Sequence, residues 1–298
     1  MDAEIVEITD PTCSWAWGTE PKLRRLRWRF GAVVDPLWRR VPGGLVPDQK
    51  ALNPEFDPVR RAPRMTEYWS RTTTYTGMPY PIGMAWAASS SIDACRGVVA
   101  AGFQGPEVQG ALLRRLRDQI FIWGRPADTV ARVVAVAATV PGLDAPSLSS
   151  DIDSPAALEA YDRCWEETRS PNEYTRTLVD DPVGSGHTKV EEHTGRERYV
   201  FPTLLFRGPG GEVTVPGWKP YADYEAALAT AVPGSTSTPR PDPTPDEAFA
   251  EWPLLTVKEL AFLCGEGSTP PPDVVEHDWG DGVVWQTADA AAAWLEID

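Results

Sequence analysis

A single cysteine stands where a strand pattern gives way to a helix pattern, and this feature limits the fold more than any other. Residues 4–9, EIVEIT, alternate in polarity and are rich in β-branched side chains, which predicts a strand that ends by Pro11. Cys13 follows, and apolar residues then recur at helical spacing over 14–30, with a kink or break predicted at Pro21. The order strand, stop, cysteine, helix predicts a thiol at a helix N-terminus.

A thiol in that place should be reactive. Unpaired backbone N–H groups and the positive end of the helix dipole lower the pKa of a cysteine below its free value of about 8.5. We therefore expect Cys13 to be a nucleophile. The alternative is a small buried hydrophobe, which is the role we expect for Cys95 and Cys164 inside helix-like runs.

Further strand patterns lie at both ends of the chain's first 232 residues. Residues 32–41 predict a second strand, interrupted or near an edge because it contains Pro36. Strand patterns return at 198–206 and 211–216, joined by Gly-Pro-Gly-Gly, and a helix pattern follows at 221–232. The order predicts an α/β fold whose first two strands are parallel and whose last two form a hairpin.

The middle of the chain predicts helices. Helix-like runs cover 86–102, 106–123, 127–140 and 154–170, whereas 47–70 is rich in Pro and Arg and lacks a clear period. We expect an α-helical insertion that splits the sheet domain and covers its active face.

The composition of the chain changes after residue 232. Residues 233–247 are rich in Pro, Ser and Thr and predict a linker. A helix over 255–265 with Thr256 as N-cap, a strand at 282–287 and a last helix form a small C-terminal α/β unit that resembles half of a winged helix. Its acidic loop disfavours DNA and favours a protein partner or a lid role. The expected boundaries are 1–50 with 181–232 for the sheet domain, 51–180 for the insertion, 233–247 for the linker and 248–298 for the C-terminal unit.

Charge and cysteine spacing exclude several functions. The 28 basic and 43 acidic residues give a formal net charge of −15, which disfavours nucleic acid and anionic membranes as partners. No apolar run of 18 residues occurs, and the acidic start lacks the features of a secretory signal, so we expect a cytoplasmic protein. The four cysteines are widely spaced, which predicts neither a disulfide framework nor a metal site.

A proline interrupts the strongest late strand pattern. Pro cannot donate to a sheet ladder, so Pro202 in YVFPTLLF predicts a special bend, and the Phe201–Pro202 bond is a candidate cis peptide.

Together these residues resemble the DsbA family of thioredoxin-fold proteins, and in particular its FrnE-like branch. The resemblance rests on Asp10-Pro11-x-Cys13-x-Trp15-x-Trp17-Gly18, on the Ser-Ser-x-x-Ala-Cys run at 90–95 and on Phe201-Pro202-Thr203, and it covers about residues 3–232. It implies a thioredoxin-like fold with Cys13 as the attacking thiol. It also implies that substrate meets Ser14, Trp15 and Ala16 on one side and Phe201, Pro202 and Thr203 on the other.

The chain departs from this family at Ala16, where a second cysteine normally stands. No internal disulfide can form at the motif, so a mixed disulfide on Cys13 needs an outside thiol for its release. A natural monothiol enzyme, an oxidoreductase, isomerase or transferase, would then use a low-molecular-weight thiol as cosubstrate, act on a disulfide or small molecule and need no tightly bound cofactor. The related FrnE-like proteins imply a place in natural-product biosynthesis. Three alternatives stay open: an engineered Cys→Ala change, a non-catalytic adaptor and a small-molecule-binding protein.

Three further residues are candidates for the site. Trp123, in IFIWGR, is a candidate for stacking on substrate from the helical insertion. His187 and His193 lie in a polar loop before the strand that contains Pro202, where either is a candidate proton carrier or simply a solvated loop residue.

Overall fold

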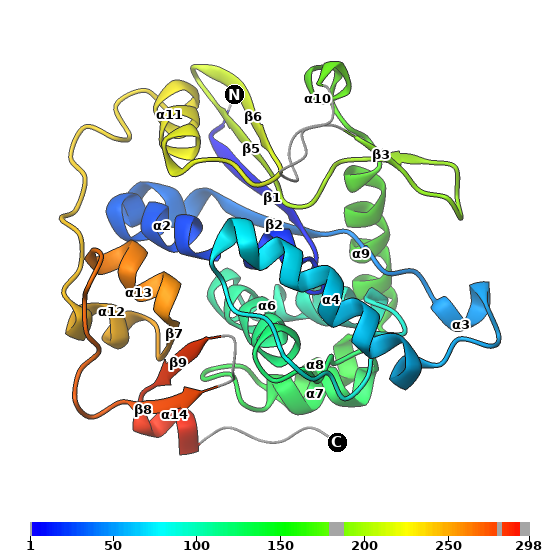
Figure 1. Ribbon diagram of the computed structural model, residues 1–298. Coiled ribbons are helices and arrows are strands. Elements are labelled where there is room, and N and C mark those ends of the chain that lie inside the picture. The colour runs from blue at the N-terminus through cyan, green and yellow to red at the C-terminus, as the bar shows by residue number, and fades with distance from the viewer. Residues whose placement is uncertain (1, 179–187, 279–281, 293–298) are drawn as a thin grey trace.

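A four-stranded sheet joins the two ends of the sheet domain. The structure is a computed structural model that describes residues 2–178, 188–278 and 282–292. The strand order is β2-β1-β5-β6, with β1 (Glu4–Thr9) parallel to β2 (Trp38–Pro42). β1 also pairs antiparallel with β5 (Thr203–Gly208), which forms a hairpin with β6 (Gly211–Pro216). The predicted parallel pair and hairpin are confirmed, and β1 lies at the centre of the molecule (Figure 1).

The helices next to this sheet differ in detail from the prediction. The run over 14–30 divides into α1 (Ser14–Trp17) and α2 (Glu20–Val34), because Pro21 occupies the first turn of a new helix, where its missing N–H breaks no bond. The predicted strand at 32–41 starts only at Trp38, since α2 and a 3₁₀ turn, η1 (Asp35–Leu37), take its first half. Helix α11 (Tyr221–Ala231) matches its prediction. Side chains of α2 and α11 form one core with the sheet, including Ile5, Leu26, Phe206 and Leu228.

The insertion between β2 and β5 is helical, as expected. It contains α3 (Gln49–Leu52), α4 (Pro58–Thr76), α5 (Ile92–Ala101), α6 (Pro106–Phe121), α7 (Val130–Ala137), α8 (Ala145–Asp151), α9 (Pro155–Thr168) and α10 (Glu173–Thr177). A short ribbon of β3 (Lys189–Val190) and β4 (Glu197–Arg198) precedes β5. The insertion has a core of its own, built mainly by Val98, Leu112, Leu116, Val133 and Leu148.

The longest helix of the insertion, α4, was missed in the sequence. The Asp57 side chain accepts hydrogen bonds from Val59 N and Arg60 N and so caps its N-terminus. Pro63 lies inside the helix, and the buried residues are Ala62, Trp69, Thr72 and Thr76, so few large apolar side chains mark the helix in the sequence. In Figure 1, α4 runs across the front of the molecule.

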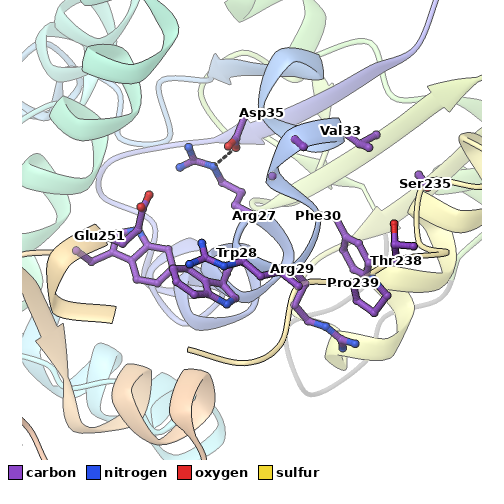
Figure 2. Close-up of a pocket in the computed structure, with 14 residues that line it drawn as sticks. Arg27, Trp28, Arg29, Phe30, Val33, Asp35, Ser235, Thr238, Pro239 and Glu251 are labelled. Carbon is purple, nitrogen blue, oxygen red and sulfur yellow. Dashed lines mark hydrogen bonds and ion pairs between the residues drawn. The ribbon is translucent and has the colours of Figure 1, made fainter. Parts of the chain in front are cut away.

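Residues 233–244 are not an unanchored linker. Trp28 Nε1 on α2 donates to Pro241 O at 2.7 Å, and the Arg240 guanidinium lies 3.3 Å from the centre of the Trp28 ring. The segment, α2 and the end of α12 (Pro245–Glu251) line a cavity of about 510 Å³, where Arg27 points to Asp35 (Figure 2). Backbone and aromatic contacts thus attach this segment to α2, although its composition alone predicted a flexible linker.

The C-terminal unit has a three-stranded antiparallel sheet in the order β7-β9-β8. Its elements after α12 are β7 (Leu254–Thr256), α13 (Val257–Cys264), β8 (Val275–Asp278), β9 (Val283–Gln286) and α14 (Ala288–Ala292). The predicted N-cap at Thr256 is confirmed as a capping box with Glu259. Turns and irregular backbone, not a further helix, occupy 265–274. Within the described ranges, no helix is both long and apolar enough to cross a membrane.

The C-terminal unit packs against α1, α4 and α6. Its Leu254 and Val284 join an apolar cluster that contains Trp17, Trp69 and Phe121. A buried carboxylate adds an ionic contact, described below.

Candidate functional site

Cys13 lies between the start of α1 and the loop before β5. It is the N-cap of α1, and its sulfur accepts a hydrogen bond from Ala16 N at 3.4 Å. The same sulfur donates to Phe201 O at 3.3 Å, and the Phe201–Pro202 peptide bond is cis. The tertiary structure therefore brings together the two motifs that the sequence singled out.

The expectation of an acidic thiol is wrong for this structure. Cys13 is only 4% exposed, and burial raises the pKa of its thiol to about 11. The Ala16 N–H and the Arg117 guanidinium lower the pKa, and the Asp10 carboxylate raises it, but none of these outweighs burial. At neutral pH the thiol is protonated, which agrees with its role as a hydrogen-bond donor.

Asp10 organises the turn between β1 and α1. This fully buried carboxylate accepts hydrogen bonds from Thr12 N at 2.8 Å, Leu45 N at 2.6 Å and Ser91 Oγ at 3.0 Å. The Cys95 thiol also donates to it at 3.3 Å. The sequence motif contained Asp10, but the partners that define its role come from distant loops.

The three residues after Cys13 have separate environments. Ser14 is buried, with its hydroxyl 3.2 Å from that of Thr72 on α4. Trp15 is half-buried, and its ring centre lies 6.0 Å from that of Tyr75. Ala16 is buried in the same apolar cluster as Cys13, so the position that would carry a resolving thiol points into the core.

The loop before β5 is tightly packed around Phe201. A Cβ on Gly43 would lie 2.2 Å from Phe201 Cζ, so this close approach requires glycine. The Arg198 guanidinium lies 4.7 Å from the centre of the Phe201 ring. Thr203 is buried, and its hydroxyl donates to Val200 O at 2.7 Å.

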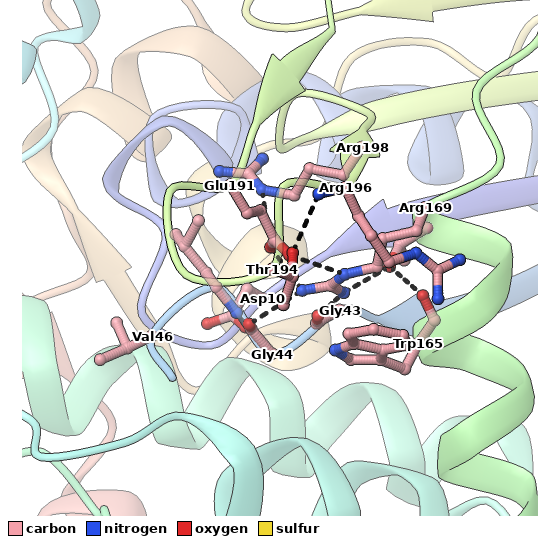
Figure 3. A network of polar contacts seen from close by, with 12 residues as sticks. Asp10, Gly43, Gly44, Val46, Trp165, Arg169, Glu191, Thr194, Arg196 and Arg198 are labelled. Carbon is pink, nitrogen blue, oxygen red and sulfur yellow. Dashed lines mark hydrogen bonds and ion pairs between the residues drawn. The ribbon is translucent and has the colours of Figure 1, made fainter. Parts of the chain in front are cut away.

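A buried ion pair fixes this loop and the one after β2. Arg169, at the end of α9, donates to both carboxylate oxygens of Glu191, at 2.5 and 3.2 Å. It also donates to the carbonyl oxygens of Gly43 and Gly44, and Glu191 in turn pairs with Arg198 at 3.3 Å (Figure 3). Sequence analysis missed this pair, because its members lie in segments without a recognisable pattern.

A second buried cation lies near enough to Cys13 to lower the pKa of its thiol. Arg117, on α6, donates to Glu20 and to the hydroxyl of Thr9, and its Nη2 lies 3.5 Å from Glu7 Oε1. A signal for this cluster was present in the sequence, since Glu7 is an acid at the centre of the EIVEIT strand.

The buried charges continue into the C-terminal unit. Glu259, fully buried on α13, lies 3.1 Å from Arg24 Nη1 and pairs with Arg114 through both carboxylate oxygens. Burial alone would raise the pKa of Glu259, but Arg114 and Arg24 outweigh it and hold the pKa at about 2. Arg114 is also 3.7 Å from Glu20, the residue that binds Arg117.

A small cavity lies next to Thr12, the residue before Cys13. It has a volume of about 170 Å³. Its lining is mostly apolar and comprises Thr12, Leu45, Val46, Pro47, Gln49, Phe56, Arg61, Met65, Trp69, Ala87, Ala88 and Ile120. Ile120, from the IFIWGR segment, is one of these lining residues.

The other candidate residues lie elsewhere or outside the described part. Trp123 does not line this cavity, and its ring packs edge-on against His277 of the C-terminal unit, with 5.5 Å between the ring centres. His193 is exposed in the turn between β3 and β4, and His187 lies outside the described residues. Among the residues that the structure describes, no group of three or more His, Cys, Asp or Glu side chains is arranged to hold a metal ion.

No known family model matches the chain. Among solved structures, it is similar to a protein from Nitrosomonas europaea assigned as a protein disulfide isomerase, with a TM-score of 0.55 and 17% identity over 77% of this chain and 97% of the other. It is also similar to the cytosolic disulfide reductase DsbM from Pseudomonas aeruginosa, with a TM-score of 0.52 and 18% identity over 76% and 98%. The fold is that of DsbA-like thioredoxin proteins. At this identity, the likeness concerns the fold alone.

Curated sequence relatives have a different description. The chain is 26% identical over 204 residues to the ClpXP adapter protein SpxH of Halalkalibacterium halodurans, covering 66% of this chain and 65% of that protein. It is 27% identical over 157 residues to SpxH of Shouchella clausii, covering 53% and 50%. The chain thus spans between half and two thirds of the length of these relatives.

Proposed function

We propose that the protein is an adaptor that holds a client polypeptide at a DsbA-like site, without turning over disulfides. The observation that carries the proposal is the state of Cys13. Its sulfur is buried, is hydrogen-bonded as a donor and has a pKa of about 11, and buried Ala16 occupies the position where exchange would need a second thiol. Such a site keeps the shape of a thioredoxin groove but lacks a thiolate and a resolving group.

The names of the sequence relatives support this proposal, since both are called ClpXP adapters. By analogy, the client of this chain would pass to a protease of the ClpXP type. A reducing, cytoplasmic location fits, because all four cysteines are free.

The test follows protein half-lives in the host cell. Deleting the gene should lengthen the half-lives of a small set of proteins measured by pulse labelling, and inactivating ClpXP should lengthen the same set. A Cys13→Ser copy should restore rapid turnover, because a serine hydroxyl can also donate to Phe201 O and needs no thiol chemistry. Loss of rescue in a folded Cys13→Ser protein would refute an adaptor that works without its thiol.

A second function is favoured by one specific observation. The Ala16 N–H points at the Cys13 sulfur from a helix N-terminus, which is the arrangement that stabilises a thiolate once it forms. In this case Cys13 attacks a disulfide, forms a mixed disulfide and releases one thiolate, and an external low-molecular-weight thiol then frees Cys13. The FrnE-like assignment and a role in natural-product biosynthesis belong to this second proposal.

The two functions separate in a turnover assay. Purified protein supplied with oxidised glutathione and a thiol reductant should show no sustained reduction if it is an adaptor. Repeated turnover that Cys13→Ser abolishes would favour the monothiol enzyme.

A further inference from the structure

Helix α4 presents an unusual surface beside Cys13. Tyr68 and Tyr75 are 52% and 49% exposed, although tyrosine side chains are on average partly buried. The ring of Tyr75 packs near the half-buried ring of Trp15. Burial raises the pKa of Tyr68, and Cys13 lies near enough to raise it further. An aromatic rim therefore runs along α4 next to the thiol.

The 170 Å³ cavity adjoins this rim. α4 contributes Arg61, Met65 and Trp69 to its lining, at a spacing of four residues that places them on one helix face. An engineered apolar cavity of about 150 Å³ holds one benzene molecule. The cavity beside Thr12 therefore has room for one aromatic or branched aliphatic side chain.

The charge of α4 is opposite to that of the whole protein. The chain carries −15 in total, yet Arg60, Arg61 and Arg64 are all exposed near the start of this helix. Arg60 pairs with Asp57 at 3.3 Å. Over the described ranges 2–178, 188–278 and 282–292, Arg61 and Arg64 make no ion pair. Arg61 thus lines the apolar cavity, and Arg64 lies about one turn further along the same helix, on a molecule that is acidic as a whole.

We propose that this surface, formed by Arg61, Arg64, Met65, Tyr68, Trp69 and Tyr75 and called the α4 surface, docks an acidic polypeptide segment. One apolar side chain of the segment fills the cavity, and neighbouring carboxylates pair with Arg61 and Arg64. The acidic remainder of the protein repels such a segment, which confines it to α4. The inference rests on the proposed adaptor function and assigns its client-binding surface.

The test uses a fluorescein-labelled peptide, Gly-Asp-Glu-Phe-Glu-Asp-Gly, and the full chain, with affinity measured by fluorescence anisotropy. We expect saturable binding that weakens with added salt, and at least tenfold weaker binding of the peptide with Ala in place of Phe. The double variant Arg61→Glu/Arg64→Glu should weaken binding at least tenfold. Ala88→Phe, which fills the cavity, should abolish the preference for Phe over Ala.

Arg163→Glu provides a charge-reversal control, because Arg163 is also exposed but lies on a different helix, α9, where it pairs with Glu159. It should leave the affinity unchanged. Should Ala88→Phe not fold by circular dichroism, the double charge reversal and the Phe-to-Ala peptide still decide the matter.

Several results would overturn the proposal: no binding of the Phe peptide, equal affinity for both peptides, or equal loss in Arg163→Glu and in the double variant. The adaptor function is judged separately by the half-life experiment. If clients are found there while the peptide test fails, the α4 surface is the wrong assignment and the adaptor function stands.

Discussion

The sulfur of Cys13 donates a hydrogen bond to the carbonyl oxygen of Phe201 at 3.3 Å, across 188 positions of sequence. This contact covers the thiol with the loop before β5 and helps to keep it protonated. Reactivity at this site therefore depends on how well the loop is held, and not only on the helix that begins at Cys13.

The reactivity of Cys13 should rise steeply with pH. Because burial raises its pKa to about 11, the thiolate fraction is far smaller, and alkylation by iodoacetamide at pH 7.5 should be slower than for free cysteine by roughly two orders of magnitude or more. The rate should keep rising with pH to about 11, measured by mass spectrometry of the peptide that contains Cys13. A plateau below pH 8 would contradict a buried, protonated thiol.

Adducts on Cys13 should persist in the unsubstituted protein. With oxidised glutathione at pH 9, we expect one glutathione on Cys13 that only added reductant removes, because Ala16 cannot resolve it. In Ala16→Cys, the adduct should give way to an internal disulfide with loss of glutathione, seen by intact mass. Spontaneous loss of the adduct from the unsubstituted protein would indicate that another cysteine reaches Cys13.

Removing the charge of Asp10 should have two effects. Asp10→Asn should lower the pKa of Cys13, because the carboxylate raises it, and the alkylation profile should move to lower pH. The free energy of unfolding should fall by about 2 kcal/mol, because an amide cannot accept all the hydrogen bonds from Thr12, Leu45 and Ser91. Urea denaturation measures the change in the free energy of unfolding. An unchanged pH dependence of Cys13 alkylation would argue against the predicted change in its pKa.

Glu259→Gln should destabilise the protein by about 3–5 kcal/mol, since it leaves Arg24 and Arg114 buried without their carboxylate. The folded-state pKa of Glu259, about 2, lies below its ordinary value of 4.5. Its contribution is therefore complete above about pH 4.5 and is lost as the pH falls towards 2. Unfolding measured from pH 7 to 2 should show the difference between the two proteins shrinking over that window. Glu247→Gln, in the exposed capping box of α12, should cost far less.

Gly43→Ala should weaken the site without touching a charged group. Its methyl group would lie 2.2 Å from Phe201 Cζ, so the loop must shift, and we expect a loss of about 1–3 kcal/mol of unfolding free energy. Gly83→Ala is the matched control, because a Cβ there meets no atom within 4 Å. Equal stability of the two variants would show that the loop around Phe201 can shift to accommodate the methyl group at little cost in free energy.

Some features of this protein followed from its sequence because they depend on neighbours a few positions away. The N-cap position of Cys13, the capping box at Thr256 and the hairpin of β5 and β6 are local structures, in which a side chain or turn satisfies backbone groups within about four residues. The order of strands and helices along the chain followed from the same local patterns, whereas the thioredoxin-like fold was implied by the resemblance of the motifs to the DsbA family. Helix α4 was missed because it contains Pro63 and is polar on average, with few large apolar side chains to mark its buried face.

Only the tertiary structure decided the chemistry of the site. The helix N-terminus alone predicted an acidic thiol at Cys13, but burial outweighs the hydrogen bond from Ala16 N and the charge of Arg117 and raises the pKa. Arg117 and Glu259 likewise become site residues through partners more than 90 positions away. Burial and ion pairing are properties of the assembled core, where a charge is stabilised by whichever groups the fold brings within a few ångströms, and no local pattern records that choice.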